Sequence, residues 1–121
     1  MVSFTIEKRG EVRYYAALLT VNEIIVLRGI ECRDLIECIY SIYSIRTHAP
    51  DFSKYDLMYS LHGHCFFELT GSNGKVIARS ILYENETDVC IGIEFVRRTI
   101  QLARIEDFTH LISCYPLYNF N

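Results

Sequence analysis

The chain has 121 residues, of which 50% are hydrophobic and 22% are charged. It is therefore long enough for one packed domain, and a disordered, collagen-like or linker-type chain is excluded. Twelve Lys and Arg against fifteen Asp and Glu give a formal net charge of −3, which argues against a protein held to DNA or to an anionic membrane by bulk charge.

Secretion and membrane insertion are not expected. The first ten residues lack the apolar core and following small residues of a signal peptide, and the longest apolar runs are far shorter than the roughly 20 residues of a membrane span. The five cysteines are therefore interpreted as thiols of a cytoplasmic protein rather than as disulfides.

The first half of the chain predicts three strands followed by a helix. Alternating and β-branched residues place the strands at 2–7, 12–20 and 24–28. Asp34 followed by Glu37 is typical of a helix start, with an N-cap side chain and an acid three positions later. Its buried stripe has spacings of four and three residues: Cys38, Ile42, Ile45 and Ala49. Pro50 ends the helix.

The second half predicts the same order of elements. The strands are expected at 55–61, 65–70 and 75–80, with a tight turn at Asn73-Gly74 because both residues tolerate positive φ. Asn85 and Asp88 repeat the helix start. The stripe of this second helix is Val89, Ile93, Val96 and Ile100. Beyond it, residues 108–114 are a candidate for a short last strand, and the rest of the tail is unassigned.

An internal duplication accounts for this repetition. At an offset of 51 residues, positions 22–56 align with 73–107 without a gap. Six of the 35 aligned pairs are identical: Asn22/Asn73, Arg28/Arg79, Ile30/Ile81, Ile42/Ile93, Arg46/Arg97 and Asp56/Asp107. The agreement of caps and helix stripes supports the alignment more strongly than these identities do.

The predicted fold is a single α+β domain over residues 1–121. It consists of two tandem β-β-β-α(-β) repeats, 2–50 and 55–109, that share one antiparallel sheet with two helices packed on one face. Residues 50–54 are the linker, and 110–121 form a C-terminal tail. One repeat of about 50 residues would bury too little surface alone, so the two repeats are expected to share their sheet.

Several residues of the second half carry a family signature. They are Asn73-Gly74-Lys75-Val76-Ile77, Ser80, Tyr83, Gly92-Ile93, Val96-Arg97-Arg98 and Ile105-Glu106-Asp107-Phe108-Thr109. This pattern resembles the YegP-like family of tandem repeats, over roughly residues 4–109. The first half departs from it, with Gly29, Cys32 and Ser41 in place of the serine, tyrosine and glycine. The resemblance implies three strands, a helix and a short further strand per repeat, in which two repeats or two subunits complete one sheet by exchanging end strands. It implies no known activity, substrate or catalytic residue.

A metal site is the first chemical candidate. His62, His64 and Cys65 have the side-chain types of zinc ligands. In a strand, however, positions 62 and 64 share one side and 65 faces the other, and no fourth ligand follows at a motif spacing. The alternative interpretation is a polar hairpin turn with Cys65 in the core. Neither a metal nor another cofactor is predicted.

Thiol chemistry is the second candidate. Cys32 precedes the helix cap at Asp34, where a helix N-terminus would favour a thiolate. Its acidic neighbours Glu31 and Asp34 are expected to raise its pKa, and no histidine is placed as its base. Cys38 and Cys90 are interpreted as small buried hydrophobic residues. Without a Cys-x-x-Cys, a phosphate loop or a nucleophile elbow, the sequence predicts no enzyme.

A third candidate is single-stranded nucleic-acid binding through the sheet face. It would use aromatic platforms and phosphate-binding arginines: Tyr14, Tyr15, Phe66 and Phe67, with Arg13, Arg28 and Arg79. Adjacent aromatic residues of a strand face opposite sides, so at most one of each pair is available. The negative net charge also disfavours this interpretation.

The remaining interpretation is a small non-catalytic binding module of the YegP-like type. Its partner is an unknown protein or small ligand, and it is a monomer or a homodimer. The binding surface is expected on the uncovered sheet face or along the tail, where four apolar side chains gather: Tyr115, Leu117, Tyr118 and Phe120. The alternative is that these side chains fold back over the sheet and close the domain.

Overall fold

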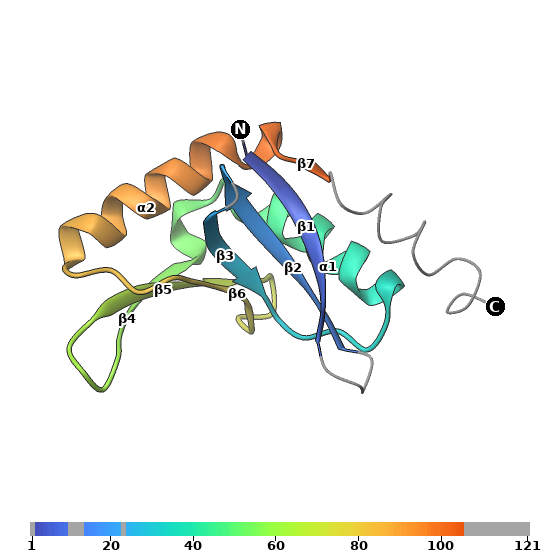
Figure 1. Ribbon diagram of the computed structural model, residues 1–121. Coiled ribbons are helices and arrows are strands. Elements are labelled where there is room, and N and C mark those ends of the chain that lie inside the picture. Colours follow the sequence, from blue (N-terminus) through green and yellow to red (C-terminus); the bar gives the residue numbers. More distant parts are fainter. Residues whose placement is uncertain (1, 10–13, 23, 106–121) are drawn as a thin grey trace.

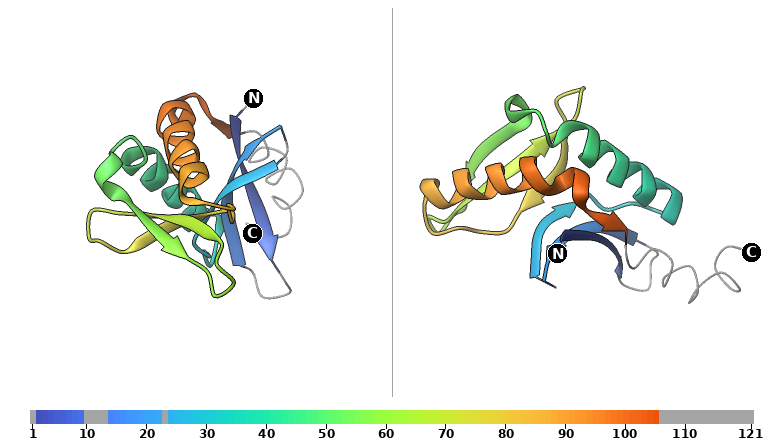
Figure 2. Two further views of the ribbon diagram at one scale, coloured as in Figure 1. Left: turned by 90° about the vertical axis from the view of Figure 1, so that its left-hand side faces the viewer. Right: turned by 90° about the horizontal axis from the view of Figure 1, so that it is seen from above.

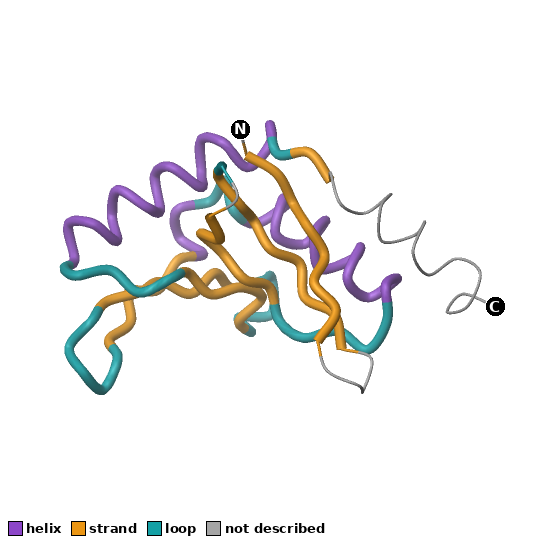
Figure 3. The backbone as a smooth tube through the Cα atoms, viewed as in Figure 1, coloured by secondary structure: helices purple, strands orange, loops and turns teal. Residues whose placement is uncertain are grey.

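The computed structural model describes residues 2–9, 14–22 and 24–105, with the side chains of 7–9 and 14–18 left out. Its elements follow in the order β1 (Val2–Arg9), β2 (Tyr14–Val21), β3 (Ile24–Gly29), α1 (Leu35–His48), η1 (Phe52–Lys54), β4 (Tyr55–Tyr59), β5 (Cys65–Thr70), β6 (Val76–Ser80), α2 (Glu86–Thr99), η2 (Ile100–Leu102) and β7 (Arg104–Ile105). Figure 1 labels these elements, and Figure 3 colours the helices and strands. The predicted α+β class is confirmed, with seven strands in one sheet and two α-helices.

The strands form a single mixed sheet in the order β4-β5-β6-β3-β2-β1-β7. Six of them pair antiparallel, and β7 pairs parallel to β1 through Arg104 and Ile105. The expectation of a purely antiparallel sheet is therefore wrong at this edge. The candidate strand at 108–114 lies outside the described residues.

Both helices begin as their sequences predict. The Asp34 side chain accepts a hydrogen bond from the Glu37 N–H at 2.9 Å, and Asn85 accepts one from the Asp88 N–H at 2.9 Å. These bonds satisfy N–H groups that the first turn of a helix leaves without an intrahelical acceptor. Each cap residue has an extended backbone, so the chain changes direction there and enters the helix.

One hydrophobic core joins the two halves. The buried side chains of the strands include Phe4, Leu19, Leu27, Phe67 and Leu69, and those of the helices include Ile42, Ile45, Val89, Val96 and Ile100. The two sets meet because both helices lie on the same side of the bent sheet (Figure 2). Within the described residues, no helix is both long enough and apolar enough to cross a membrane.

The junction between the two halves of the sheet is β3 against β6. Here Leu27, Arg28 and Gly29 pair with Ser80, Arg79 and Ala78 in antiparallel register. The sheet twists strongly at this junction, so that β1–β3 and β4–β6 run in different directions (Figure 1). The β2–β3 hairpin and α2 line one groove near this junction, where the candidate site forms.

Candidate functional site

An apolar groove opens between α2 and the turn that joins β2 to β3. Its volume is about 470 Å³, within the range of small-molecule binding sites. The β2–β3 hairpin, the segment after β6 and one face of α2 line it: Val21, Asn22, Ile24 and Val26, then Ile81 and Tyr83, then Asp88, Ile91, Gly92 and Phe95. We call this feature the α2 groove.

The groove exists because α2 packs on β5 and β4, beside the β2–β3 hairpin. Its apolar walls are consequently left in contact with water. Ile24 is 65% exposed on the hairpin side, and Ile91 is 63% exposed on α2. Each Å² of apolar surface left in water costs about 25 cal/mol, so an apolar occupant of the groove would bind favourably.

Tyr83 is placed between the sheet and α2. Its backbone exchanges two hydrogen bonds with Cys65, with N···O distances of 2.9 and 2.6 Å, which fix the segment beside β5. The ring then lies against α2 at Gly92, where a Cβ atom would come within 2.8 Å of the Tyr83 Cζ. Burial raises the pKa of the Tyr83 phenol, and the Asp88 carboxylate raises it further. The phenol therefore stays neutral and can donate a hydrogen bond at ordinary pH.

Asp88 supplies the carboxylate that lines the α2 groove. It sits in the first turn of α2, where a negative charge is stabilised by the helix dipole. The other polar groups of the lining are the Asn22 amide and the Tyr83 hydroxyl. An apolar groove with one carboxylate at its wall suits a ligand with an apolar body and a cationic head.

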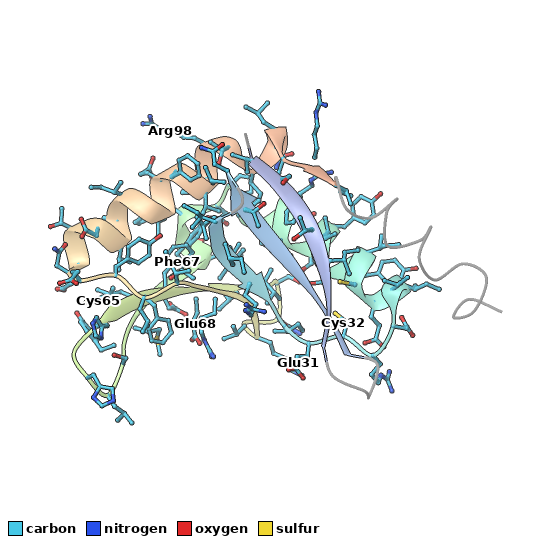
Figure 4. All side chains as sticks on the ribbon, in the orientation of Figure 1. Glu31, Cys32, Cys65, Phe67, Glu68 and Arg98 are labelled. Carbon is cyan, nitrogen blue, oxygen red and sulfur yellow. The ribbon has the colours of Figure 1, made fainter. Side chains whose placement is uncertain are left out.

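The opposite face of the sheet carries a row of charges across four strands. In register, Asp56 of β4 lies opposite Glu68, Glu68 opposite Arg79, and Arg79 opposite Arg28. We call this the cross-strand charge row. Arg79 donates to Glu68 through Nε at 2.9 Å, and its guanidinium lies 5.7 Å from the centroid of the Phe66 ring. Figure 4 shows Glu68 and Phe67 on opposite sides of β5.

The candidates for nucleic-acid binding are only partly brought together. Phe67 is buried in the core, 5.4 Å from the Tyr55 ring, whereas Phe66 is half-buried beside Arg79. Arg28 and Arg79 are cross-strand neighbours. Arg13 and the side chains of Tyr14 and Tyr15 lie outside the described part of the structure.

The three residues predicted as candidate metal ligands lie in different environments. His62 and His64 are exposed in the turn between β4 and β5, which Gly63 allows with a φ of 85°. Cys65 is buried at the start of β5. Among the residues that the structure describes, no group of three or more His, Cys, Asp or Glu side chains is positioned to hold a metal ion.

Cys32 lies shortly before α1, and its thiol donates a hydrogen bond to the Ile30 carbonyl at 3.5 Å. The neighbouring Cys38 thiol lowers the pKa of Cys32 below its ordinary value, although burial and the carboxylates of Glu37 and Asp34 act in the other direction. Acidic neighbours therefore raise the pKa of Cys32 as expected, but the Cys38 thiol lowers it by more. The six-residue separation of Cys32 and Cys38 matches no redox or metal motif.

The predicted tail surface cannot be placed. Tyr115, Leu117, Tyr118 and Phe120 lie outside the described residues, which end at Ile105. The α2 groove was not predicted from the sequence. The sequence feature that could have indicated the groove is the apolar pair Ile91 and Phe95, which lies on the side of α2 away from the predicted buried stripe.

Comparison with known proteins finds a family model that is similar to part of the chain. Residues 62–107, which include β5, β6 and α2, match the family described as a domain of unknown function, DUF1508. The resemblance to the YegP-like family is confirmed. None of the curated proteins matches the chain.

Two solved structures share the fold. A UPF0339 protein from Shewanella oneidensis superposes with a TM-score of 0.76 at 17% identity, covering 86% of this chain and 89% of that one. The protein yegP from E. coli, described as of unknown function, has the same TM-score and identity and covers 86% of this chain and 90% of its own. At this level of identity, the likeness establishes the fold alone.

Proposed function

We propose that this protein is a small non-catalytic binding module and that its ligand occupies the α2 groove. The observation that carries the proposal is the combination of a volume of about 470 Å³, apolar walls and one carboxylate. The ligand class that fits is a small amphipathic amine, with an apolar body between Ile24 and Ile91 and an ammonium group facing Asp88. No covalent chemistry is required of the groove.

The size of the α2 groove favours a small ligand over a protein partner. The groove takes a molecule of modest size, whereas a stable protein interface buries about 800 Å² on each partner. Mostly apolar walls with a few placed polar groups are typical of small-molecule sites. The charge of Asp88 then provides the selectivity, because an amine is attracted and a carboxylate of the same length is repelled.

The test uses a neutral fluorescent probe, N-phenyl-1-naphthylamine, and three competitors of equal chain length. Octylammonium should displace the probe at lower concentrations than octanol, and octanoate should be the weakest. Ile91→Ser should weaken probe binding several-fold. The matched control is Ile36→Ser on α1, because Ile36 is also 63% exposed but lies outside the groove. Equal effects of the two substitutions would contradict the proposal.

A second variant separates the charge from the apolar walls. Asp88→Asn should abolish the preference for octylammonium over octanoate while leaving probe binding nearly unchanged. Asp56→Asn, which removes an exposed carboxylate on β4 and not in the groove, should leave that preference intact. An unchanged preference in Asp88→Asn would show that this carboxylate does not recognise the ligand.

Single-stranded nucleic-acid binding is the weaker alternative. Its best support is the cross-strand pair Arg28 and Arg79. Against it, Arg79 is already ion-paired with Glu68, and Asp56 extends the acidic end of the same row. Two carboxylates beside the arginines repel phosphate, which makes the face a poor electrostatic match.

We further propose that the two halves are tandem copies of one unit. Reciprocal contacts support this: Arg46 of α1 donates to the carbonyl of Ala103, which follows α2, and Arg97 of α2 donates to the carbonyl of Pro50, which follows α1. Both helices also have 14 residues and equivalent caps. The free thiols Cys32, Cys38, Cys65 and Cys90 fit a cytoplasmic location. An experimental structure whose halves failed to superpose would contradict the duplication.

A further inference from the structure

A second cavity lies beside the start of α1. Its volume is about 280 Å³. It is lined by α1, by the segment between β3 and α1, and by Ile77 of β6. It shares no lining residue with the α2 groove. We call this feature the α1 cavity.

The α1 cavity and the α2 groove lie at corresponding positions of the two halves. At the offset of 51 residues, seven of the eight described residues that line the α1 cavity correspond to residues that line the α2 groove. Six of these pairs lie on the helices and on the segments before them: Ile30/Ile81, Cys32/Tyr83, Glu37/Asp88, Tyr40/Ile91, Ser41/Gly92 and Ser44/Phe95. The seventh pair crosses between the halves, because Ile77 of β6 lines the α1 cavity and Val26 of β3 lines the α2 groove. The same arrangement of elements therefore forms both sites.

The two sites differ where the second half has a tyrosine. At α2, the Tyr83 ring lies so close to Gly92 that a Cβ atom there would be 2.8 Å from the Tyr83 Cζ. At α1 the corresponding residues are Cys32 and Ser41. The short Cys32 side chain donates to the Ile30 carbonyl at 3.5 Å and does not extend as far as a tyrosine ring. The α1 cavity therefore has space at the position that corresponds to the Tyr83 ring.

The wall of the α1 cavity carries a buried hydroxyl group without a partner. Ser41 is 9% exposed, and its Oγ makes no hydrogen bond within the described part of the chain. A buried hydroxyl that stays unpaired is costly, and such groups usually serve a bound water or a ligand. Rotation about the Cα–Cβ bond lets the hydroxyl turn toward the cavity. There it can exchange a hydrogen bond with a hydroxyl group of a ligand.

The charged groups of the α1 cavity are acidic. Glu31 and Glu37 supply two carboxylates, and none of its described lining residues is basic. Arg33 donates to Glu37 through Nε at 3.1 Å, but this ion pair lies at the surface, with 84% of the Arg33 side chain exposed. Exposed ion pairs of this kind are weak. An ammonium group can therefore compete with Arg33 for the Glu37 carboxylate.

Two further exchanges make the α1 cavity more polar than the α2 groove. Tyr40 and Ser44 stand at the positions of Ile91 and Phe95. Two aliphatic or aromatic walls of the α2 groove are thus replaced by side chains that carry hydroxyl groups. A ligand with a hydroxyl group fits this lining better than a plain alkyl chain does.

We propose that the α1 cavity is a second ligand site and that it binds a small phenolic amine. The aromatic ring packs against Ile30 and Ile77, in the space that corresponds to the Tyr83 ring. The phenol hydroxyl bonds with Ser41 Oγ, and the carboxylates attract the ammonium group. A free ring can lie farther from the helix than a tethered tyrosine, which leaves room for the Ser41 Cβ atom. Binding here does not require a ligand in the α2 groove, because the two sites share no lining residue.

The test titrates the full chain with tyramine and follows its amide signals by NMR spectroscopy. Shift changes should cluster at Cys32, Ser41 and Ile77. Phenethylamine, which lacks the hydroxyl group, should bind several-fold more weakly, and 3-(4-hydroxyphenyl)propionate, which carries a carboxylate in place of the ammonium group, should be weakest. The signals of Ile24 and Ile91 report the α2 groove separately, so each site can fail without the other. Shift changes confined to the α2 groove, or none at all, would overturn the proposal.

Two variants test the space and the hydroxyl group. Cys32→Tyr with Ser41→Gly restores the pair found at α2, so the new ring should fill the α1 cavity and abolish tyramine binding while the amide spectrum stays that of a folded protein. Ser41→Ala should remove the preference for tyramine over phenethylamine. The matched control Ser72→Ala, at an exposed serine outside the cavity, should keep that preference. Tyramine binding to the folded double variant, or an unchanged preference in Ser41→Ala, would refute the assignment of the site.

Discussion

Tyr83 lies so close to Gly92 that any Cβ atom at that helix position would require the tyrosine ring to shift. A Cβ atom at Gly92 would be 2.8 Å from the Tyr83 Cζ and closer still to the hydroxyl oxygen. The contact explains why a glycine lies inside α2, although glycine in a helix interior lowers stability by about 1 kcal/mol relative to alanine. The contact fixes the tyrosine that forms part of the α2 groove.

Gly92→Ala should therefore destabilise the protein, against the usual effect of this exchange in a helix. We expect a loss of about 1–3 kcal/mol in the free energy of unfolding, as for other overpacked sites, measured by urea denaturation. In the Tyr83→Ala variant, Gly92→Ala should lower the free energy of unfolding by less than it does when Tyr83 is present. A more stable Gly92→Ala protein would show that the tyrosine can move aside freely.

Arg79 should stabilise the sheet through Glu68. Removing the guanidinium leaves a largely buried carboxylate opposite Asp56, and like charges directly opposite each other destabilise a sheet. We expect Arg79→Ala to lower the free energy of unfolding by about 1–3 kcal/mol. Adding Asp56→Asn should recover part of this loss. A double-mutant cycle with no coupling between positions 56 and 79 would contradict the role of the cross-strand charge row.

Stability should fall in alkaline solution because of buried tyrosines. Burial raises the pKa of Tyr55 and Tyr83 above the ordinary value of 10.0, so well below that pH both phenols are neutral in the folded and unfolded states. Above it the unfolded chain releases protons that the folded chain retains, which favours unfolding. The thermal midpoint should therefore drop as the pH rises above about 10, and Tyr83→Phe should reduce the slope. A flat profile would show that these phenols are solvated in the folded state.

Arg46 should hold the end of the second half against α1. Its guanidinium donates to the Ala103 carbonyl and lies 5.4 Å from the centroid of the Phe4 ring, beside the β1–β7 pair. Arg46→Met should speed hydrogen exchange at β7 more than at β5. A hydrogen bond to a charged group contributes about 1.5–3 kcal/mol, so the difference should reach tenfold or more. Uniform acceleration across the sheet would indicate global destabilisation instead.

The sequence predicted the features that depend on local spacing. The caps at Asp34 and Asn85, the helix stripes and the six longer strands follow from neighbouring residues, and the structure contains all of them. The parallel pairing of β7 with β1 was missed because it joins residues about 100 positions apart through only two residues. The periodic spacing of hydrophobic residues does not indicate a contact between such distant residues.

The candidate sites were harder to predict for the same reason. The α2 groove depends on where α2 lies relative to the β2–β3 hairpin, and the two are joined across the sheet by the pairing of β3 with β6. The cavity beside Cys32 depends on the turn into α1. Both arise from tertiary geometry, so composition and spacing indicated the residue types without indicating that they meet.

The most direct test of the central claim is an NMR titration of the full chain with octylammonium chloride. We expect amide shift changes that cluster at Ile24, Ile81 and Ile91, around the α2 groove, and that become smaller in Asp88→Asn at the same concentrations. Shift changes confined to the cross-strand charge row or to residues 106–121 would contradict the claim.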